Sequence, residues 1–492
     1  MLPNAAQSDR QALAIALQRG DTAQAGTLLR RLLKNAPGDA GLQHTAAELA
    51  WRGGNRVNAL KHFGLALEGC LTNPTAPQAD AIRDSASQYI GHLLGSYAID
   101  CKALLSRKVL IDLLGNPQVD PQAIAGAAAP LWMDTPPWRR LFTLSPEKAA
   151  QHLLSDDGIV ARQDRLAAAL LTRAVLCDPS IEALLQALRF ALLNQPADAV
   201  DQSFLRLIAR QWHLRDYAAP VTDDEMALLG PLRQALPTNA LDRLKRALYA
   251  DPAPWLTSVE AAKDPWLAAL LANHEKEQGL LATLPVAASI AARHDSVTAQ
   301  YEQHPYPRWL GFTRPAAGSR RALIMRATHQ SDWRNRPLDV LIAGCGTGRH
   351  ALMAAHGYGP TATLLAVDIS RTSLGYAVRM AETYKTNNLR FAQADLLALD
   401  DLPDGLIPKT GFDVIESVGV LHHLPDTGEG LAALARTLKP GGVIQLGLYR
   451  RKGRGHVAQA RDEIAALGLD PTQDDDIRRY RAHVLADPSH PS

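Results

Sequence analysis

Three glycines at alternate positions follow a short apolar segment in the last third of the chain. Gly344, Gly346 and Gly348 come directly after the run 338–343, whose composition is typical of a buried parallel strand. Because glycine has no Cβ atom, the backbone of such a turn can approach a ligand closely. A second apolar segment ends at Asp368, where a carboxylate can accept both hydroxyl protons of a ribose. The pattern predicts a binding site for a nucleoside cofactor.

The spacing of the glycines distinguishes between cofactors. A dinucleotide-binding loop has the pattern G-x-G-x-x-G, and its third glycine allows close packing of the following helix. Here Arg349 occupies that third position, and the last glycine comes one residue earlier. This spacing, followed by an acid at the end of the next strand, resembles motifs I and II of class I methyltransferases that use S-adenosylmethionine (SAM). Arg349 argues against the alternative of an NAD-dependent oxidoreductase.

The resemblance implies further residues of a SAM site. In this class the acid after the third strand accepts a hydrogen bond from the adenine amine, and Asp395 occupies that position. The alternative role for Asp395 is that of a helix N-cap. The residues after the two acids, Ile369 and Leu396, and Ser417 at the end of the fourth strand are also expected to contact the cofactor.

Two adjacent histidines follow the fourth strand and are the candidate catalytic residues. If the methyl acceptor is a hydroxyl or a protonated amine, a base must remove a proton, and imidazole titrates near neutral pH. Adjacent residues of an extended segment point to opposite sides, so we expect one of His422 and His423 to face the cofactor, and favour His423. The alternative is that the pair supports the loop or contacts SAM without proton transfer. Without a third ligand at suitable spacing, we expect no metal site. Glu416 is expected to shape the pocket.

An aromatic segment precedes the glycines. Tyr301, Tyr306, Arg308 and Trp309 stand close together, with prolines that prevent a continuous helix. These four residues could form a lid over the cofactor and contact the methyl acceptor. A rigid linker between domains is an equally good interpretation.

Alternating strands and helices from residue 338 to residue 449 predict an open, doubly wound parallel sheet. Residues 294–492 thus resemble a class I methyltransferase domain. That class adds a helix and two more strands after the fifth strand. Here the chain offers helical patterns at 458–467 and 474–485, but no convincing sixth and seventh strands. We therefore expect either a shortened member of the class or a replacement of those strands.

The first 75 residues contain an internal repeat. Gly20 and Gly54 are 34 residues apart, as are Ala25 and Ala59. This period resembles two tetratricopeptide repeats, with a generic pair of helical hairpins as the alternative. Residues 76–293 have helical patterns throughout and predict an all-helical domain of unknown role. Together these features resemble a family of bacterial tetratricopeptide-repeat SAM-dependent methyltransferases.

The composition of the 492 residues sets limits on the function. A net charge of +2 gives no electrostatic reason to expect nucleic acid or a membrane surface as a partner. Four scattered cysteines suit free thiols in the cytoplasm. We therefore expect a cytoplasmic SAM-dependent methyltransferase that acts on an unidentified small molecule or protein, with the repeats recruiting a protein partner. The alternative is a SAM-binding scaffold or sensor without turnover.

Overall fold

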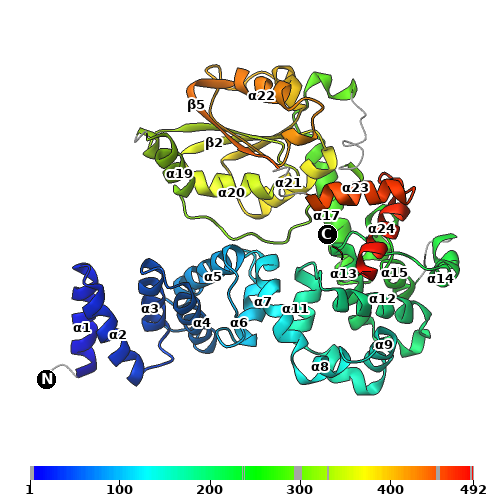
Figure 1. The fold of residues 1–492 in the computed structure, drawn as a ribbon, viewed down its shortest axis with the longest axis horizontal. Helices are drawn as coiled ribbons and strands as arrows, with labels where there is room; N and C mark the ends of the chain where they lie inside the picture. The colour runs from blue at the N-terminus through cyan, green and yellow to red at the C-terminus, as the bar shows by residue number, and fades with distance from the viewer. Residues whose placement is uncertain are drawn as a thin grey trace. The chain divides into compact units, whose positions relative to one another are not determined.

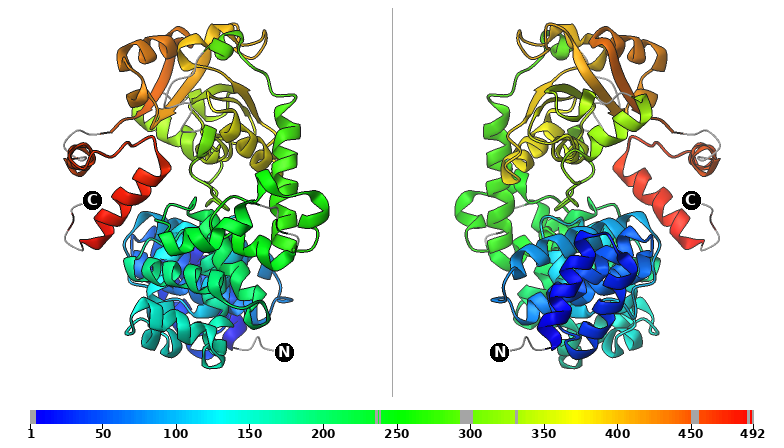
Figure 2. Two further views of the ribbon diagram at one scale, coloured as in Figure 1. Left: turned by 90° about the vertical axis from the view of Figure 1, so that its right-hand side faces the viewer. Right: turned by 90° about the vertical axis from the view of Figure 1, so that its left-hand side faces the viewer.

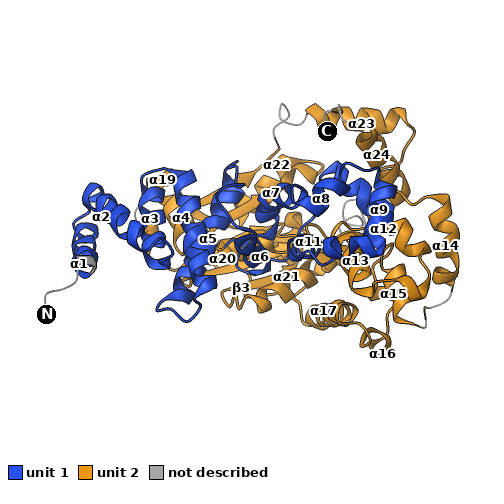
Figure 3. Cartoon of the chain, turned by 90° about the horizontal axis from the view of Figure 1, so that it is seen from below, with its two compact units in different colours: residues 1–188, 310–313 blue, residues 189–309, 314–492 orange. Residues whose placement is uncertain are grey.

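The computed structural model describes residues 5–234, 237, 239–292, 302–329, 332–449, 455–487 and 490. Tyr301, one of the four lid candidates, lies outside the described residues. The chain divides into two compact units (Figure 3). Unit 1 contains residues 1–188 and 310–313, and unit 2 contains residues 189–309 and 314–492.

Unit 1 is built from helices connected by short turns. Its helices are α1 (Ala5–Gln18), α2 (Thr22–Asn35), α3 (Ala40–Arg52), α4 (Arg56–Thr72), α5 (Ala79–Ser96), α6 (Arg107–Gly115), α7 (Pro121–Met133), α8 (Pro136–Leu141), α9 (Pro146–Leu154), η1 (Asp156–Gly158), α10 (Ile159–Arg162) and α11 (Arg165–Arg173). Helix α12 (Pro179–Asn194) begins in unit 1 and ends in unit 2.

The 34-residue offset recurs in the local geometry of unit 1. Gly20 and Gly54 have φ angles of 70° and 79°, a left-handed conformation that glycine adopts without a Cβ penalty. The next residues, Asp21 and Asn55, cap α2 and α4 by accepting a hydrogen bond from the backbone N–H three positions later. The sequence repeat therefore corresponds to a repeated start of a helix.

The first half of unit 2 is also helical. It contains η2 (Ala197–Ala199), α13 (Gln202–Leu214), α14 (Asp223–Gln234), α15 (Ala240–Arg246), η3 (Ala253–Trp255), α16 (Ser258–Ala261), α17 (Pro265–Leu281) and η4 (Ala288–Ala292). Helix α17 packs against a helix of the sheet domain, α21 (Arg371–Thr383), and the Arg379 Nε atom lies 2.7 Å from Oε1 of Glu277. The helical segment and the sheet therefore share packing within this unit.

The second half of unit 2 has a parallel sheet in the order β3-β2-β1-β4-β5. The strands among the described residues are β1 (Leu338–Ala343), β2 (Ala362–Asp368), β3 (Leu389–Gln393), β4 (Phe412–Val418) and β5 (Leu438–Gly447). The other elements are α19 (Ser319–Thr328), η5 (Asp332–Arg334), α20 (Arg349–Tyr358), η6 (Leu396–Asp401), η7 (Leu421–His423) and α22 (Thr427–Arg436). The order confirms the predicted doubly wound sheet and places its switch point between β1 and β4.

Helices cover both faces of this sheet. Figure 1 shows α22 over one face and α20 and α21 over the other. On the α22 face, Leu341 of β1, Leu365 of β2 and Ile415 of β4 pack with Leu399 of η6 and Leu434 of α22. Strands buried on both faces read as continuous apolar runs, which is why β1, β2 and β4 could be predicted from composition.

Helix α22 is followed closely by β5. The helix begins at Thr427, because the Asp426 side chain caps it by accepting hydrogen bonds from the Gly428 and Glu429 N–H groups. Strand β5 begins at Leu438 and includes the Pro-Gly-Gly sequence. The pairing with β4 is irregular there, which accommodates the proline at the edge of the sheet.

Two helices, α23 (Gly455–Ala466) and α24 (Asp474–Ala486), follow the sheet. Neither has a buried residue, and Figures 1 and 2 show both (red) beyond the end of β5. Among the described residues, no helix combines the length and the apolar composition required to cross a membrane.

Candidate functional site

The three glycines form a tight turn, the glycine loop (344–348), between β1 and α20. All three have φ between 51° and 83°. A Cβ atom at Gly344 would collide with the side chain of Val420, and one at Gly348 would lie 2.6 Å from the Cβ of Ala377. A Cβ at Gly346 would meet only the Tyr306 carbonyl oxygen, at 3.7 Å. The outer glycines are therefore required for packing, whereas Gly346 leaves open space where a ligand can approach the backbone.

Asp368 at the end of β2 connects to this loop. Its Oδ2 accepts a hydrogen bond of 2.7 Å from the Gly346 N–H, and its Oδ1 accepts one of 2.9 Å from the Ser370 N–H. Burial raises the pKa of the Asp368 carboxyl, against the lowering effect of these hydrogen bonds. The carboxylate thus lies beside the open glycine, as a group that binds a ribose must.

The next predicted cofactor residues come after β2 and β3. Asp395 is buried and caps η6, with 2.9 Å between its Oδ1 and the Leu397 nitrogen, so the alternative N-cap role is present in the structure. Leu396 belongs to the apolar core on the α22 face. The Ile369 carbonyl accepts a hydrogen bond from the Gln393 side chain.

Ser417, at the end of β4, is fully buried. Within the described residues, its Oγ has no hydrogen-bond partner. A buried hydroxyl without a partner is uncommon in proteins and suits a position next to a bound polar molecule.

The two histidines lie in η7, and their geometry corrects one expectation. Because η7 is a 3₁₀ turn rather than an extended segment, the two rings do not point to opposite sides: their centroids are 4.3 Å apart. The ring of His422 also contacts Tyr449, at a centroid distance of 3.7 Å. The side chain of His423 is exposed. Contact between Val420 and the glycine loop brings this turn beside the expected cofactor site.

The aromatic segment lies along the glycine loop, and we refer to residues 302–309 as the strap. The Thr347 hydroxyl donates a 2.8 Å hydrogen bond to the Pro307 carbonyl, and the Trp309 Nε1–H donates one of 2.9 Å to the Thr347 carbonyl. At the other end, Glu302 accepts hydrogen bonds from the backbone N–H groups of Arg371 and Thr372 at the start of α21. The strap is therefore fixed to the loop and to the helix that follow β1 and β2.

The three described lid candidates have different environments. Trp309 is 5% exposed and packs against Tyr376 of α21, so its ring is part of the core and not a contact surface for an acceptor. Arg308 is held by two carboxylates, those of Asp216 and Asp251. Tyr306 is 74% exposed beside Gly346, and its side chain is the one of the three that is available to a ligand.

A buried ionic cluster surrounds the side chain of Glu416 in β4. Glu416 accepts hydrogen bonds from His350 Nε2 at 2.7 Å and the Tyr358 hydroxyl at 2.5 Å, and it pairs with Arg320. Burial acts to raise the pKa of Glu416, but the hydrogen bond from His350 and the charge of Arg320 outweigh it and hold that pKa below its usual value. Glu416 thus shapes this part of the sheet as a charged carboxylate.

Several of these residues were missed by reasoning from the sequence. Glu302 lies in the aromatic segment but was not singled out, although its position among the four lid candidates was a usable signal. Arg320, His350 and Tyr358 come from two helices, and only the fold brings them to Glu416.

Comparison with known proteins identifies the domain. Residues 340–442, which include the glycine loop, Asp368, Asp395 and η7, match the family of methyltransferase domains. The chain carries a methyltransferase domain. It is of the class I type, for which SAM is the methyl donor.

Relatives of known sequence match part of the chain. An uncharacterized protein of Synechococcus sp. is 35% identical over 187 residues, 36% of this chain. The 27-O-demethylrifamycin SV methyltransferase of Amycolatopsis mediterranei is 29% identical over 30% of the chain, and the trans-aconitate 2-methyltransferase of Deinococcus radiodurans is 35% identical over 21%. The chain spans 43%, 58% and 35% of these three relatives, respectively.

Among solved structures, the YcgJ protein of Bacillus subtilis is 22% identical, and the match covers 34% of this chain and 65% of that one. Its TM-score of 0.23 is too low to carry an argument.

Proposed function

We propose that this chain transfers a methyl group from SAM to an acceptor that binds at the carboxyl ends of β4 and β5. One observation carries the proposal: the Asp368 carboxylate is hydrogen-bonded to the N–H of Gly346, the glycine that leaves open space within a matched methyltransferase domain. An acidic strand end joined to a bare backbone turn offers acceptors for ribose hydroxyls beside room for the rest of a nucleoside.

The residues present fit SAM. In the proposed site, the backbone of Gly344, Gly346 and Gly348 approaches the cofactor, and Asp368 accepts hydrogen bonds from the ribose. Asp395 accepts a hydrogen bond from the adenine amine. It can do so while it caps η6, because a carboxylate has about four acceptor positions. Ile369 and Leu396 contact the nucleoside, and Ser417 Oγ supplies a polar contact. The buried hydroxyl of Ser417, which has no hydrogen-bond partner in the described part of the chain, supports this assignment.

SAM supplies a methyl group on a sulfonium, which is already a good electrophile. The chain must therefore orient the acceptor, exclude water and, where the acceptor carries a proton, remove that proton. We propose His423 as the base, since its ring is exposed on η7, and His422 as its support, since its ring packs against Tyr449. Tyr306, exposed beside Gly346, is proposed to contact the acceptor.

The N-terminal helices are proposed to be tetratricopeptide-like repeats that recruit a protein or carrier-bound acceptor. The matched caps of α2 and α4 at a 34-residue offset support this assignment. A cytoplasmic location is supported by the cysteines, all four of which are free.

The proposal is tested in two steps on the full chain. Calorimetric titration measures SAM binding, and incubation with SAM and a cell extract is followed by detection of S-adenosylhomocysteine and mass spectrometry of methylated products. Binding with turnover is the expected result. Binding without turnover would favour the alternative of a SAM-binding scaffold or sensor. The proposal would be overturned if the protein does not bind SAM but its melting temperature is raised by a nicotinamide cofactor.

A further inference from the structure

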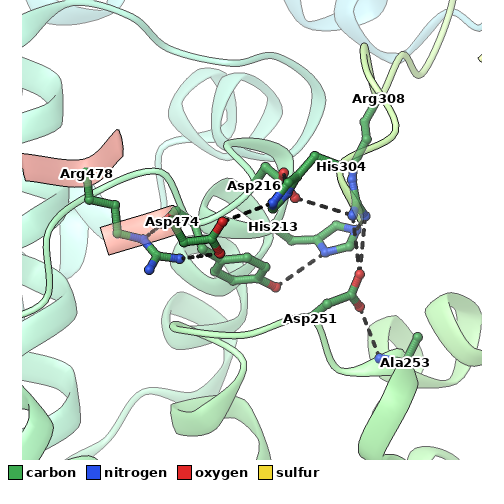
Figure 4. Close-up of polar contacts among 9 residues, drawn as sticks. His213, Asp216, Asp251, Ala253, His304, Arg308, Asp474 and Arg478 are labelled. Atoms are coloured by element: carbon green, nitrogen blue, oxygen red, sulfur yellow. Dashed lines mark hydrogen bonds and ion pairs between the residues drawn. The ribbon is translucent and has the colours of Figure 1, made fainter. Parts of the chain in front are cut away.

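The strap is held from two sides within unit 2. One side consists of the hydrogen bonds to the glycine loop and α21 described above. On the other side, His304 and Arg308 reach carboxylates of the helical segment 189–281 (Figure 4). Arg308 meets Asp216 and Asp251. His304 contacts Asp216 through Nδ1, and its Nε2 lies 3.2 Å from Oδ1 of Asp474 in α24.

Asp216 is the carboxylate that His304 and Arg308 share. Its Oδ2 lies 2.6 Å from Nδ1 of His304, and its Oδ1 lies 3.4 Å from Nη2 of Arg308. The same Nη2 lies 3.3 Å from Oδ2 of Asp251. The guanidinium group therefore bridges two carboxylates.

The neighbouring histidine is adapted to this arrangement. His213 Nε2 accepts a hydrogen bond from Arg308 Nη1 at 3.1 Å, so this nitrogen carries no proton, and Nδ1 faces the Tyr217 hydroxyl at 3.3 Å. Burial, together with the charge of Arg308, lowers the pKa of His213 to about 4, against the attraction of Asp251. A neutral His213 gives Nη1 of Arg308 an acceptor without adding a competing charge.

The backbone that presents Asp216 is strained. Asp216 and Tyr217 have φ angles of 50° and 56°, and two consecutive left-handed residues without a glycine are unusual at the end of a helix. Aspartate tolerates this conformation, but tyrosine does so poorly. Such a turn persists only where the surroundings determine it, and here the Tyr217 side chain is buried. The turn directs the Asp216 carboxylate toward the strap.

We propose that Asp216 and Arg308 are positioning residues for the cofactor: their ion pair lets the helical segment hold the strap against the glycine loop. This inference rests on the proposed function, because it assigns the strap to the closure of the SAM site. It also changes the role of Arg308, which was first predicted to contact the acceptor. Neither residue touches the reacting atoms in this proposal, so SAM affinity and not the rate at saturation is the quantity they control.

The decisive variant is Asp216→Asn, since asparagine tolerates the left-handed conformation and keeps the size of the side chain. Its SAM affinity, measured by calorimetry on the full chain, is expected to fall about tenfold, as for the loss of one charge-assisted hydrogen bond. The double variant D216N/D251N, which removes both charges from Arg308, is expected to lose more. Asp404→Asn, at an exposed aspartate outside this network, is the matched control and should bind like the native chain.

A second measurement separates positioning from general stability. Trypsin can cut the chain after Arg308, whose side chain is only 19% exposed in its ion pairs. In D216N this cut should become faster while the melting temperature stays close to the native value. Native SAM affinity and native cleavage in both D216N and the double variant would overturn the inference. A native chain that does not bind SAM would instead overturn the proposed function, and the cleavage rate alone would then decide whether the ion pair holds the strap.

Discussion

Asp368 and Gly346 are joined by a hydrogen bond of 2.7 Å between the carboxylate Oδ2 and the backbone nitrogen. The residue that is expected to bind the ribose therefore also fixes the turn that is expected to receive the rest of the nucleoside. Because Asp368 ends β2 and Gly346 follows β1, the bond links two adjacent parallel strands at their carboxyl ends. Loss of the carboxylate should disturb both parts of the site at once.

Asp368→Ala should weaken SAM binding by about 1–3 kcal/mol, the range for hydrogen bonds that involve a charged group. Calorimetric titration of the variant and the native chain measures the difference. Asp404→Ala, at an exposed position, serves as the control. Equal affinity of the Asp368→Ala variant and the native chain would exclude the ribose role.

The half-buried carboxyl of Asp368 also predicts a pH effect on stability. Because burial raises its pKa in the folded chain, the folded state binds a proton more readily than the unfolded state does. The charged form therefore costs stability at neutral pH, and this cost disappears as the pH falls through the folded-state pKa. The melting temperature of Asp368→Asn relative to the native chain should be higher at about pH 7 than at about pH 3, which is below the ordinary aspartate pKa. A difference that is constant with pH would contradict the assignment.

The three loop glycines should respond differently to substitution. Gly346→Val should fold with a loss of about 1–2 kcal/mol for its left-handed backbone, but should no longer bind SAM, since its side chain would fill the open space. Gly348→Val should lose more stability, because its Cβ would lie 2.6 Å from Ala377. Thermal unfolding and SAM titration of both variants test this contrast. A folded Gly346→Val protein that binds normally would show that the loop faces elsewhere.

Much of the site could be predicted because its residues are fixed by local sequence. Strand β1 has the bounds that its apolar run predicted. Asp368 and Asp395 could be located because each stands at the carboxyl-terminal side of an apolar run that forms a strand. The glycines require left-handed backbone, and their spacing is a local property. The orientation of His422 and His423 was predicted wrongly, because the distinction between an extended segment and a 3₁₀ turn depends on how η7 packs on the neighbouring loop.

Other features could not be read from the sequence because they join distant segments. The ion pair of Asp216 with Arg308 spans 92 residues, and the cluster around Glu416 joins residues up to 96 apart. The local pattern of apolar and polar residues carries no information on such contacts. Trp309 was a candidate lid residue by type, but aromatic residues serve cores and contact surfaces equally well, and only its burial decides between the two.

Glu416→Gln should destabilise the fold by about 3 kcal/mol, because it leaves the buried side of Arg320 without its counter-charge. The pH dependence has the opposite sign to that of Asp368. The pKa of Glu416 is lower in the folded chain than in the unfolded chain, so its contribution is present at neutral pH and is lost as the pH falls through the folded-state value. Thermal unfolding measured from neutral to acidic pH should show a difference in melting temperature between the native chain and the variant, and this difference should disappear in acid. A difference that is absent at neutral pH would argue against the ion pair.

The His422–His423 pair yields the most direct test of the chemistry. The ring of His423 is exposed, so His423→Ala should leave SAM affinity unchanged but lower the formation of S-adenosylhomocysteine by about 100- to 10,000-fold, the usual effect of removing a general base. His422→Ala should have a smaller effect on turnover, because its ring supports the turn through Tyr449 and is not proposed to take the proton. If His422→Ala is the more damaging change, the two roles are exchanged. If both variants turn over normally, neither imidazole is the base, and the acceptor must either carry no proton at the reacting atom or lose it to another group.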